Sequence, residues 1–125
     1  KDPMVRQDLM RVYVHKRVEA MLNQRAADLA RGGTPGPEGS LGKLMWTEGL
    51  TMVGEVAARV LGPRICADGG ESGTWAWREH LLGAPGYRIA GGSDEIQRNI
   101  IGERVLGLPG EPRVDKGVPW KEVPR

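Results

Sequence analysis

The 125-residue sequence contains no phenylalanine and a single cysteine, Cys66. One cysteine cannot form a disulfide within the chain, so we expect a reducing compartment, with the cytoplasm as the default. No apolar run approaches the roughly 20 residues that span a bilayer, and the opening Lys-Asp-Pro lacks the hydrophobic segment of a signal peptide. The 18 basic residues nearly balance the 16 acidic ones. Charge and hydropathy therefore argue against a membrane or a nucleic acid as partner.

The chain has the length of one domain, and it begins at Lys1 without an initiator methionine. We expect a fragment of a longer polypeptide. Residues 1–109 are expected to form a helical domain, followed by an extended tail over residues 110–125 in which Pro and Gly recur. Trp120 is expected to dock part of this tail against the domain.

Two long helices are predicted first. Residues 5–31 contain neither Gly nor Pro, and Asp2-Pro3 before them can cap and open a helix. A Gly- and Pro-rich break over 32–39 precedes the second helix, for which Ser40 is the expected cap. Gly62-Pro63 ends that helix, and Gly49 and Gly54 inside it indicate close packing of a neighbouring helix.

A short third helix is predicted over 74–82, with Thr74 as its cap and Gly83 as its stop. No alternation long enough for a sheet occurs. The predicted fold class is therefore all-α, an antiparallel helical bundle, because short loops favour antiparallel neighbours.

Three side chains on these helices have chemistry to explain. His15 is expected to be exposed, because no second ligand is spaced to help it bind a metal, and we predict no metal site. Trp75 and Trp77 lie two residues apart and point to different sides of a helix. They are expected to be core or interface anchors rather than one aromatic cage.

The most informative stretch, residues 89–101, is a glycine turn that opens directly into an amphipathic helix. Ser93 is the expected cap, and Asp94 and Glu95 follow in the first turn, where the helix dipole favours negative charge. Gly91 and Gly92 allow backbone angles closed to other residues and leave room for a close approach to the main chain. The spacing alone is more typical of a plain capped turn, and it also makes this stretch a candidate site for an anionic or polar ligand.

Residues 88–109 closely resemble the C-terminal signature of acyl-CoA dehydrogenases. In that family the signature reads Glu-Gly-Thr, a variable pair, then Ile-Gln-Arg, which Gly91-Gly92-Ser93 and Ile96-Gln97-Arg98 parallel here. The resemblance implies a helical C-terminal domain that forms a homo- or hetero-oligomer, a dimer of dimers, with FAD held between subunits. It also implies oxidation of an acyl-CoA thioester to the 2-enoyl-CoA, with an electron-transfer acceptor as a further partner.

By the same resemblance, Ser93, Asp94 and Glu95 match family positions that contact FAD, and Gly92 matches a backbone position beside the substrate thioester. In many members the catalytic base is the Glu whose position Gly91 takes here, and glycine cannot carry a proton. Three interpretations stay open. The base lies on an earlier helix outside these residues, the chain is a non-catalytic subunit of a heteromeric enzyme, or the signature is retained only for packing.

Ala90, Gly91 and Gly92 together have almost no side-chain volume, where family members commonly place a bulky aromatic residue and then the Glu. This difference leads to the hypothesis that the pocket is widened for a branched or polycyclic acyl group, such as a sterol side chain. The competing class is a structural or assembly module, a catalytically degenerate helical bundle.

Overall fold

The structure, a computed structural model, describes residues 2–33, 36–70, 73–110, 112–113 and 115–123. Among these residues the regular secondary structure is entirely helical, which confirms the all-α prediction. Parts of two predicted segments lie outside the described residues: positions 34–35 of the first loop, and positions 111, 114 and 124–125 of the tail.

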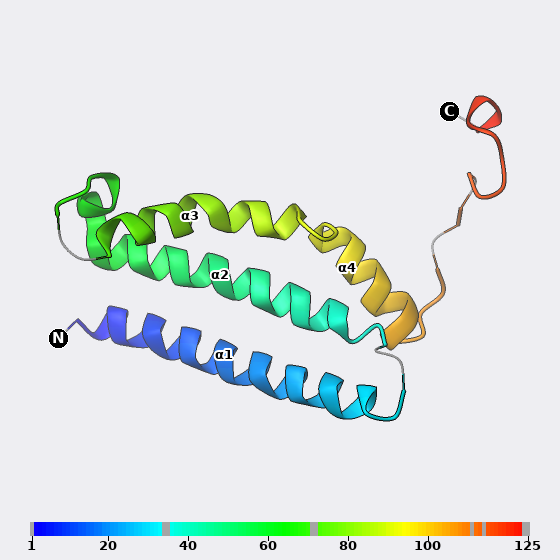
Figure 1. Cartoon of the computed structure of the whole chain (residues 1–125), viewed down its shortest axis with the longest axis horizontal. Coiled ribbons are helices and arrows are strands. Elements are labelled where there is room, and N and C mark those ends of the chain that lie inside the picture. Colours follow the sequence, from blue (N-terminus) through cyan, green and yellow to red (C-terminus); the bar gives the residue numbers. More distant parts are fainter. Residues whose placement is uncertain (1, 34–35, 71–72, 111, 114, 124–125) are drawn as a thin grey trace.

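Four α-helices form the body: α1 (Pro3–Ala30), α2 (Gly39–Leu61), α3 (Thr74–Ile89) and α4 (Asp94–Ile100). Figure 1 shows α2 in the middle, with α1 antiparallel to it on one side and α3 antiparallel to it on the other. The chain turns between α3 and α4, so that α4 lies beside the first half of α2. The central helix α2 therefore contacts every other helix of the body.

Helix α1 begins and ends close to where the sequence predicts. Asp2 is its N-cap, and the Asp2 carboxylate accepts a hydrogen bond from the backbone N–H of Met4 at 2.8 Å. Pro3 occupies the first turn, where its missing N–H costs nothing. The helix ends at Ala30, just before Gly32 and Gly33, so the prediction for this helix is confirmed.

Helix α2 differs from the prediction at its start. It begins at Gly39 with Glu38 at the cap position, and no side chain caps it, so the prediction of Ser40 as the cap is wrong. Ser40 already lies inside the first helical turn. At the other end Gly62, with φ of +55°, ends the helix as predicted, and residues Gly62–Cys66 continue as a 3₁₀ turn.

Helix α3 has 16 residues and is nearly twice as long as predicted, because it continues through Gly83 and Pro85 to Ile89. Its cap position is Gly73, and the Thr74 side chain lies outside the described part. A proline removes one helical hydrogen bond, but packing can hold the helix together. Ala84 is only 2% exposed, and α3 contacts α2 on both sides of this point, before it through His80 and after it through Tyr87. Tertiary contact therefore overrides the local stop signals.

The prediction of an exposed His15 is also wrong. His15 is half-buried on α1, and its Nε2 lies 2.7 Å from the carbonyl oxygen of Met45 on α2. Because a carbonyl oxygen only accepts, Nε2 is the donor. A Cβ at Gly49 would lie 3.1 Å from the His15 ring, so this glycine makes room for the imidazole. The predicted close packing at Gly49 is confirmed.

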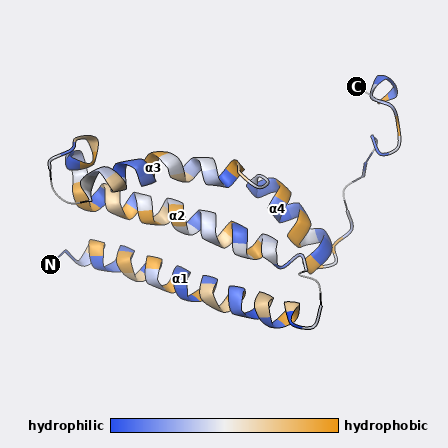
Figure 2. Cartoon of the chain, in the orientation of Figure 1, coloured by the Kyte–Doolittle hydropathy of each residue, from blue (hydrophilic) through white to orange (hydrophobic). Residues whose placement is uncertain are grey.

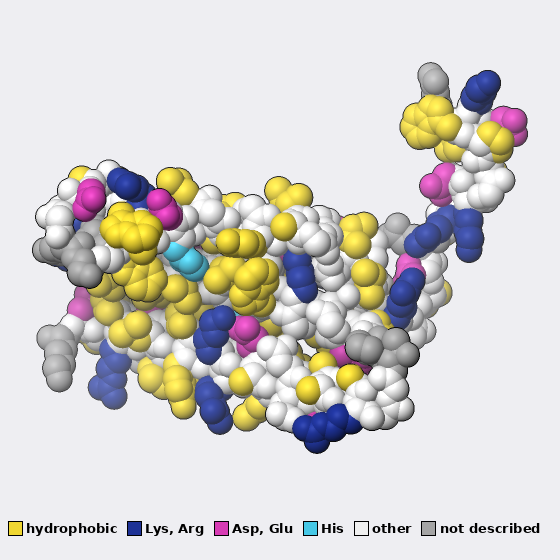
Figure 3. Space-filling model, in the orientation of Figure 1, with side chains coloured by type: hydrophobic (Ala, Val, Ile, Leu, Met, Phe, Trp, Pro, Cys, Tyr) yellow, Lys and Arg dark blue, Asp and Glu magenta, His cyan; other side chains and the backbone are white. Residues whose placement is uncertain are grey.

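Little apolar surface is buried within the chain itself. Among the described apolar residues only Ile65 and Ala84 are fully buried, while large apolar side chains on every α-helix are about half exposed. Figure 2 shows hydrophobic residues along each α-helix, and Figure 3 shows hydrophobic side chains over the face of the body that is in view. Apolar surface of this extent on a folded chain is typical of faces that contact protein, a membrane or a ligand. No described helix is both long and apolar enough to cross a membrane.

The tryptophans lie outside the core. Trp75 and Trp77 are 50% and 43% exposed, which contradicts a core role for them and leaves the interface role as a prediction. Trp120 is 87% exposed in a 3₁₀ turn, Trp120–Glu122, and the tail stands away from the body in Figure 1. The prediction that Trp120 docks the tail is wrong, because no described part of the body covers its indole.

Candidate functional site

The candidate site is the corner between α3 and α4, which we call the glycine corner and define as residues 90–95. Ser93 is the N-cap of α4, and its hydroxyl accepts from the N–H of Ile96 at 3.5 Å, so the predicted cap is confirmed. Gly91 and Gly92 have φ values of +68° and +103°, a region that side chains disfavour. The two glycines therefore permit the sharp turn that joins the helices.

Two long side chains hold the carbonyl groups of this corner. Gln97 Nε2 donates to the carbonyl oxygen of Gly91 at 3.0 Å, and Lys43 Nζ donates to that of Gly92 at 2.8 Å. Lys43 Nζ also donates to the carbonyl oxygen of Arg88, at 3.1 Å, at the end of α3. A Cβ at Gly92 would lie 2.7 Å from Gln97 Nε2, so a side chain at position 92 would displace the Gln97 amide and would also be strained at this φ.

Asp94 points into the chain rather than out of it. It is 5% exposed, and its Oδ2 accepts from Arg88 Nε at 2.6 Å, with Arg88 Nη2 also in contact. Lys43 Nζ lies 3.7 Å from Oδ1. The hydrogen bond from Arg88, with the charges of Arg88 and Lys43, holds the pKa of Asp94 below its usual value despite burial. Asp94 is therefore an ionised anchor that ties α4 to α2 and α3.

Glu95 lies on the opposite, open side. Its side chain is exposed, and a hydrogen bond from Ser93 is the main cause that lowers its pKa. A Cβ at Gly91 would meet nothing within 4 Å, so the backbone is open there too. The corner thus has an inner face, made by Asp94 and its partners, and an accessible outer face with Gly91, Ser93 and Glu95.

The acid–base properties of the corner bear on catalysis. A general base for a weakly acidic carbon requires a raised pKa, whereas the pKa values of Asp94 and Glu95 are both lowered. Gly91, which the family resemblance aligns with the position of the base, has no side chain. No cluster of His, Cys, Asp and Glu that could hold a metal occurs among the described residues. The described corner is suited to binding and positioning rather than to proton abstraction.

The five predicted site residues, 91 to 95, lie together in one corner. Among them Asp94 is buried, whereas the other four are half-buried or exposed. The sequence analysis missed Lys43, Arg88 and Gln97 as the side chains that hold this corner. Lys43 lies 49 residues before Gly92, and no local spacing signals their contact. The Arg88–Asp94 pair, six residues apart across a turn, likewise has no periodic signal.

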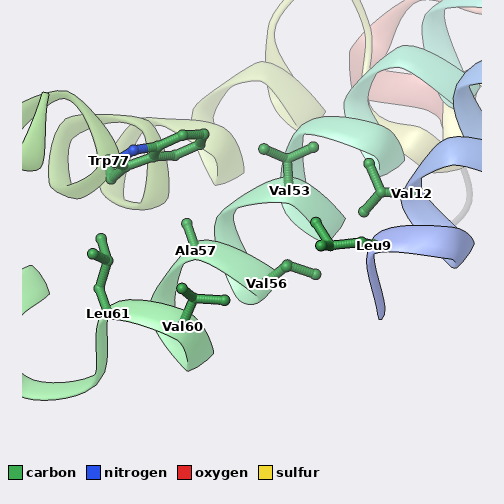
Figure 4. A pocket seen from close by; sticks show the side chains of 8 residues that line it. All are labelled: Leu9, Val12, Val53, Val56, Ala57, Val60, Leu61 and Trp77. Carbon is green, nitrogen blue, oxygen red and sulfur yellow. The ribbon is translucent and has the colours of Figure 1, made fainter. Parts of the chain in front are cut away.

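An apolar groove of about 240 Å³ lies near the other end of α2 (Figure 4). Its walls come from α1, α2 and α3, and the lining side chains are Leu9, Val12, Val53, Val56, Ala57, Val60, Leu61 and Trp77. None of them titrates at neutral pH or offers a nucleophile, so the groove has no group for chemistry.

Comparison with known proteins identifies a family whose match includes the glycine corner. The family described as acyl-CoA dehydrogenase, C-terminal domain, matches residues 1–106. The acyl-CoA dehydrogenase IpdE1 of Mycobacterium tuberculosis is 38% identical over 112 residues, and that of Mycolicibacterium smegmatis is 33% identical over 111 residues. No solved structure gives a significant match. The chain belongs to the acyl-CoA dehydrogenase family and is similar to its C-terminal helical domain.

The matched regions cover 88% of this chain but only 28% and 27% of these two relatives. The chain therefore spans about a quarter of the length of the curated relatives it matches, and the match includes all four α-helices and the glycine corner.

Proposed function

We propose that this chain is the C-terminal part of an FAD-dependent acyl-CoA dehydrogenase that oxidises an acyl-CoA thioester to the 2-enoyl-CoA. The observation that carries the proposal is the family match across residues 1–106, which includes the glycine corner and α4 near its C-terminal end. The extended apolar surface supports assembly with other domains or subunits, such as a dimer of dimers. The lone, exposed Cys66 supports a cytoplasmic location.

FAD fits the outer face of the corner better than the inner face. Glu95 is exposed and ionised, and the Gly91 backbone is open, so polar groups of a nucleotide can approach both. We propose that Ser93 and Glu95 contact FAD directly, and that Gly92 lies beside the substrate thioester through its backbone. For Asp94 we propose a contribution through its ion pairs, because its carboxylate is 7% exposed and engaged by Arg88.

The chemistry that FAD supplies when bound is acceptance of a hydride from the β-carbon of the acyl chain. The described residues would bind and orient cofactor and substrate. The proton on the α-carbon needs a base, which we place on a part of the enzyme outside this chain, either on an earlier helix of the same polypeptide or on a sister subunit. The lowered pKa values of Asp94 and Glu95 support this placement.

The second candidate is a catalytically degenerate assembly subunit of a heteromeric acyl-CoA dehydrogenase. Gly91 at the base position favours it, because this residue cannot accept a proton. The two candidates differ in what the full-length protein does with flavin and substrate.

Anaerobic mixing of the full-length purified protein with an acyl-CoA separates them. If the protein is an active dehydrogenase, its yellow flavin absorbance bleaches as the acyl-CoA is oxidised. If the absorbance bleaches only after a partner subunit is added, the base lies on that partner. Absence of flavin, with candidate partners present, would favour the assembly subunit and remove the proposed function.

A further inference from the structure

Two consecutive peptide groups in the glycine corner are held by side chains from two different helices. Gln97 of α4, only 6% exposed, donates to Gly91 O, and Lys43 of α2, with a side chain 17% exposed, donates to Gly92 O. Bonds from a charged donor in such a partly dehydrated place are stronger than those at an exposed site. The orientation of both peptide planes is therefore fixed by contacts inside the chain.

Fixing the carbonyl groups also fixes the N–H groups. The peptide bonds here are trans, and in a planar trans peptide the N–H points opposite to the C=O. The N–H groups of Gly92 and Ser93 therefore point away from Gln97 and Lys43. Neither N–H has a hydrogen-bond acceptor within the part of the chain that the structure describes. Two oriented donors are left free at the corner.

Lys43 also connects three segments of the chain through one charged group, which a neutral side chain could not do. Its single ammonium group reaches the carbonyl oxygens of Arg88 and Gly92 and lies 3.7 Å from the carboxylate of Asp94. These three partners belong to the end of α3, the turn and the start of α4, while Lys43 itself stands on α2. An ammonium has three N–H donors and a charge, so it suits two carbonyl groups and a nearby carboxylate at once.

We propose that Lys43 and Gln97 are positioning residues that set the peptide orientation of the glycine corner for the bound flavin and acyl thioester. This inference rests on the proposed function and deepens it, because it names the side chains that act through the backbone of residues 91–93. Neither residue touches the reacting atoms.

The test uses the full-length protein and variants that remove each donor at nearly constant volume, Lys43→Met and Gln97→Met. Lys43→Arg keeps charge and donors and serves as the rescue. Lys16→Met and Gln24→Met are the matched controls, since Lys16 and Gln24 pair with acidic residues within α1, away from the corner. Should Lys43→Met fail to fold, Gln97→Glu keeps the shape, removes the donor and tests the same idea at the other carbonyl group.

Two measurements are made on each protein. Amide hydrogen exchange over residues 86–100 reports the corner itself through the N–H groups of Ala90 and Gln97, which bond to Gly86 O and Ser93 O at 3.0 Å. The dissociation constant of FAD, measured by titration of the apoprotein, reports what the corner does. The melting temperature of the apoprotein is recorded beside them, so that a loss of general stability is recognised.

We expect amide exchange over residues 86–100 to be about 5- to 30-fold faster in Lys43→Met and Gln97→Met. This factor corresponds to a loss of about one or two kcal/mol in the free energy of opening this segment. The FAD dissociation constant rises about 10- to 100-fold, the range known for residues that support the ligands of a bound metal. In Lys43→Arg both the exchange rate and the FAD dissociation constant return most of the way to the wild-type values. The control variants change neither quantity.

The inference is overturned if wild-type protein binds FAD and both Met variants bind it equally well, or if they lose affinity only in proportion to a lower melting temperature of the apoprotein. Failure of the proposed function looks different, because wild-type protein then binds no flavin while the Met variants still accelerate exchange. That outcome removes the positioning role toward flavin and leaves a purely structural contact.

Discussion

His80 on α3 lies with its Nε2 2.8 Å from the carbonyl oxygen of Leu50 on α2, and this contact repeats the one that His15 makes with Met45 from α1. In each case the residue four positions after the acceptor on α2 is a glycine, Gly54 or Gly49. An α-helical carbonyl group already accepts from the N–H four residues on, so the glycine stands beside the shared oxygen. The two glycines let two histidines bind opposite sides of the central helix.

Alanine at Gly49 should therefore destabilise the protein, although alanine is the better helix former. A Cβ there would lie 3.1 Å from the His15 ring and 3.2 Å from Lys16 Nζ, so the imidazole must shift by a few tenths of an ångström, which strains its hydrogen bond to Met45. We expect a loss of about 1 to 3 kcal/mol in the free energy of unfolding. Urea denaturation of the full-length protein, followed by a probe on this domain, measures it.

Gly83→Ala is the matched control, because Gly83 also lies inside a helix but a Cβ there meets nothing within 4 Å. This variant should gain up to about 1 kcal/mol from helix propensity. Equal effects of alanine at Gly49 and Gly83 would show that the histidine contact does not explain the glycine.

Removing the charge of Asp94 should change how stability depends on pH. The pKa of Asp94 is lowered in the folded chain, chiefly by the hydrogen bond from Arg88, so its stabilising effect is present above the ordinary carboxyl value of 3.8. That effect is lost as the pH falls through this value toward the lower folded pKa. Asp94→Asn should cost about 1 to 3 kcal/mol at neutral pH and flatten the acid limb of the stability curve.

Thermal melting of the full-length protein between neutral pH and about pH 3 measures this, over the range in which a depressed carboxyl pKa acts. Asp28→Asn is the control, because the Asp28 side chain is 52% exposed and its partners, Gln24 and Arg31, lie at the same end of α1. An acid limb of unchanged steepness in Asp94→Asn would mean that the Arg88 pair does not stabilise the fold.

Acyl specificity should respond to the size of residue 90. Ala90 is exposed in extended backbone, with φ of −61° and ψ of 136°, so a larger side chain can be placed there without backbone strain. If the small residues at 90–92 make room for a branched or polycyclic acyl group, Ala90→Tyr should fill that room. Turnover of a bulky acyl-CoA by the full-length enzyme should then fall at least about tenfold, the cost of a lost pocket contact, and that of a straight-chain acyl-CoA should not.

Wild-type enzyme provides the first comparison in that experiment, since it should prefer the bulky substrate. A preference for straight chains in the wild type, or an equal loss for both substrates in Ala90→Tyr, contradicts the widened pocket.

Local sequence signals predicted those parts of the fold that depend on neighbours along the chain. The Asp2 cap, the uninterrupted run that forms α1, the Gly62 end of α2 and the Ser93 cap of α4 each follow from one or two residues, and the structure confirms them. The family resemblance likewise rested on contiguous residues, and the match over 1–106 bears it out.

The predictions that were wrong concern contacts between residues far apart in sequence. Gly83 and Pro85 are strong stop signals, yet packing against α2 continues α3 past them. The position of His15 on a charged helix does not indicate its hydrogen bond to the carbonyl oxygen of Met45, 30 residues away. The side chain of Lys43, the main contact of the glycine corner with α2, could not be identified because its partners lie 45 to 51 residues further on. Spacing rules have no access to such pairs.

We claim above all that the outer face of the glycine corner holds flavin. Titration of the full-length apoprotein with FAD tests this claim most directly, when wild type, Glu95→Gln and Glu55→Gln are compared. Both glutamates are exposed, so neither change should disturb folding, and only Glu95 lies at the corner. We predict that Glu95→Gln weakens FAD binding about tenfold, the usual effect of losing one charged hydrogen bond, while Glu55→Gln matches wild type. Equal affinity of all three proteins, or no binding by any, would contradict the claim.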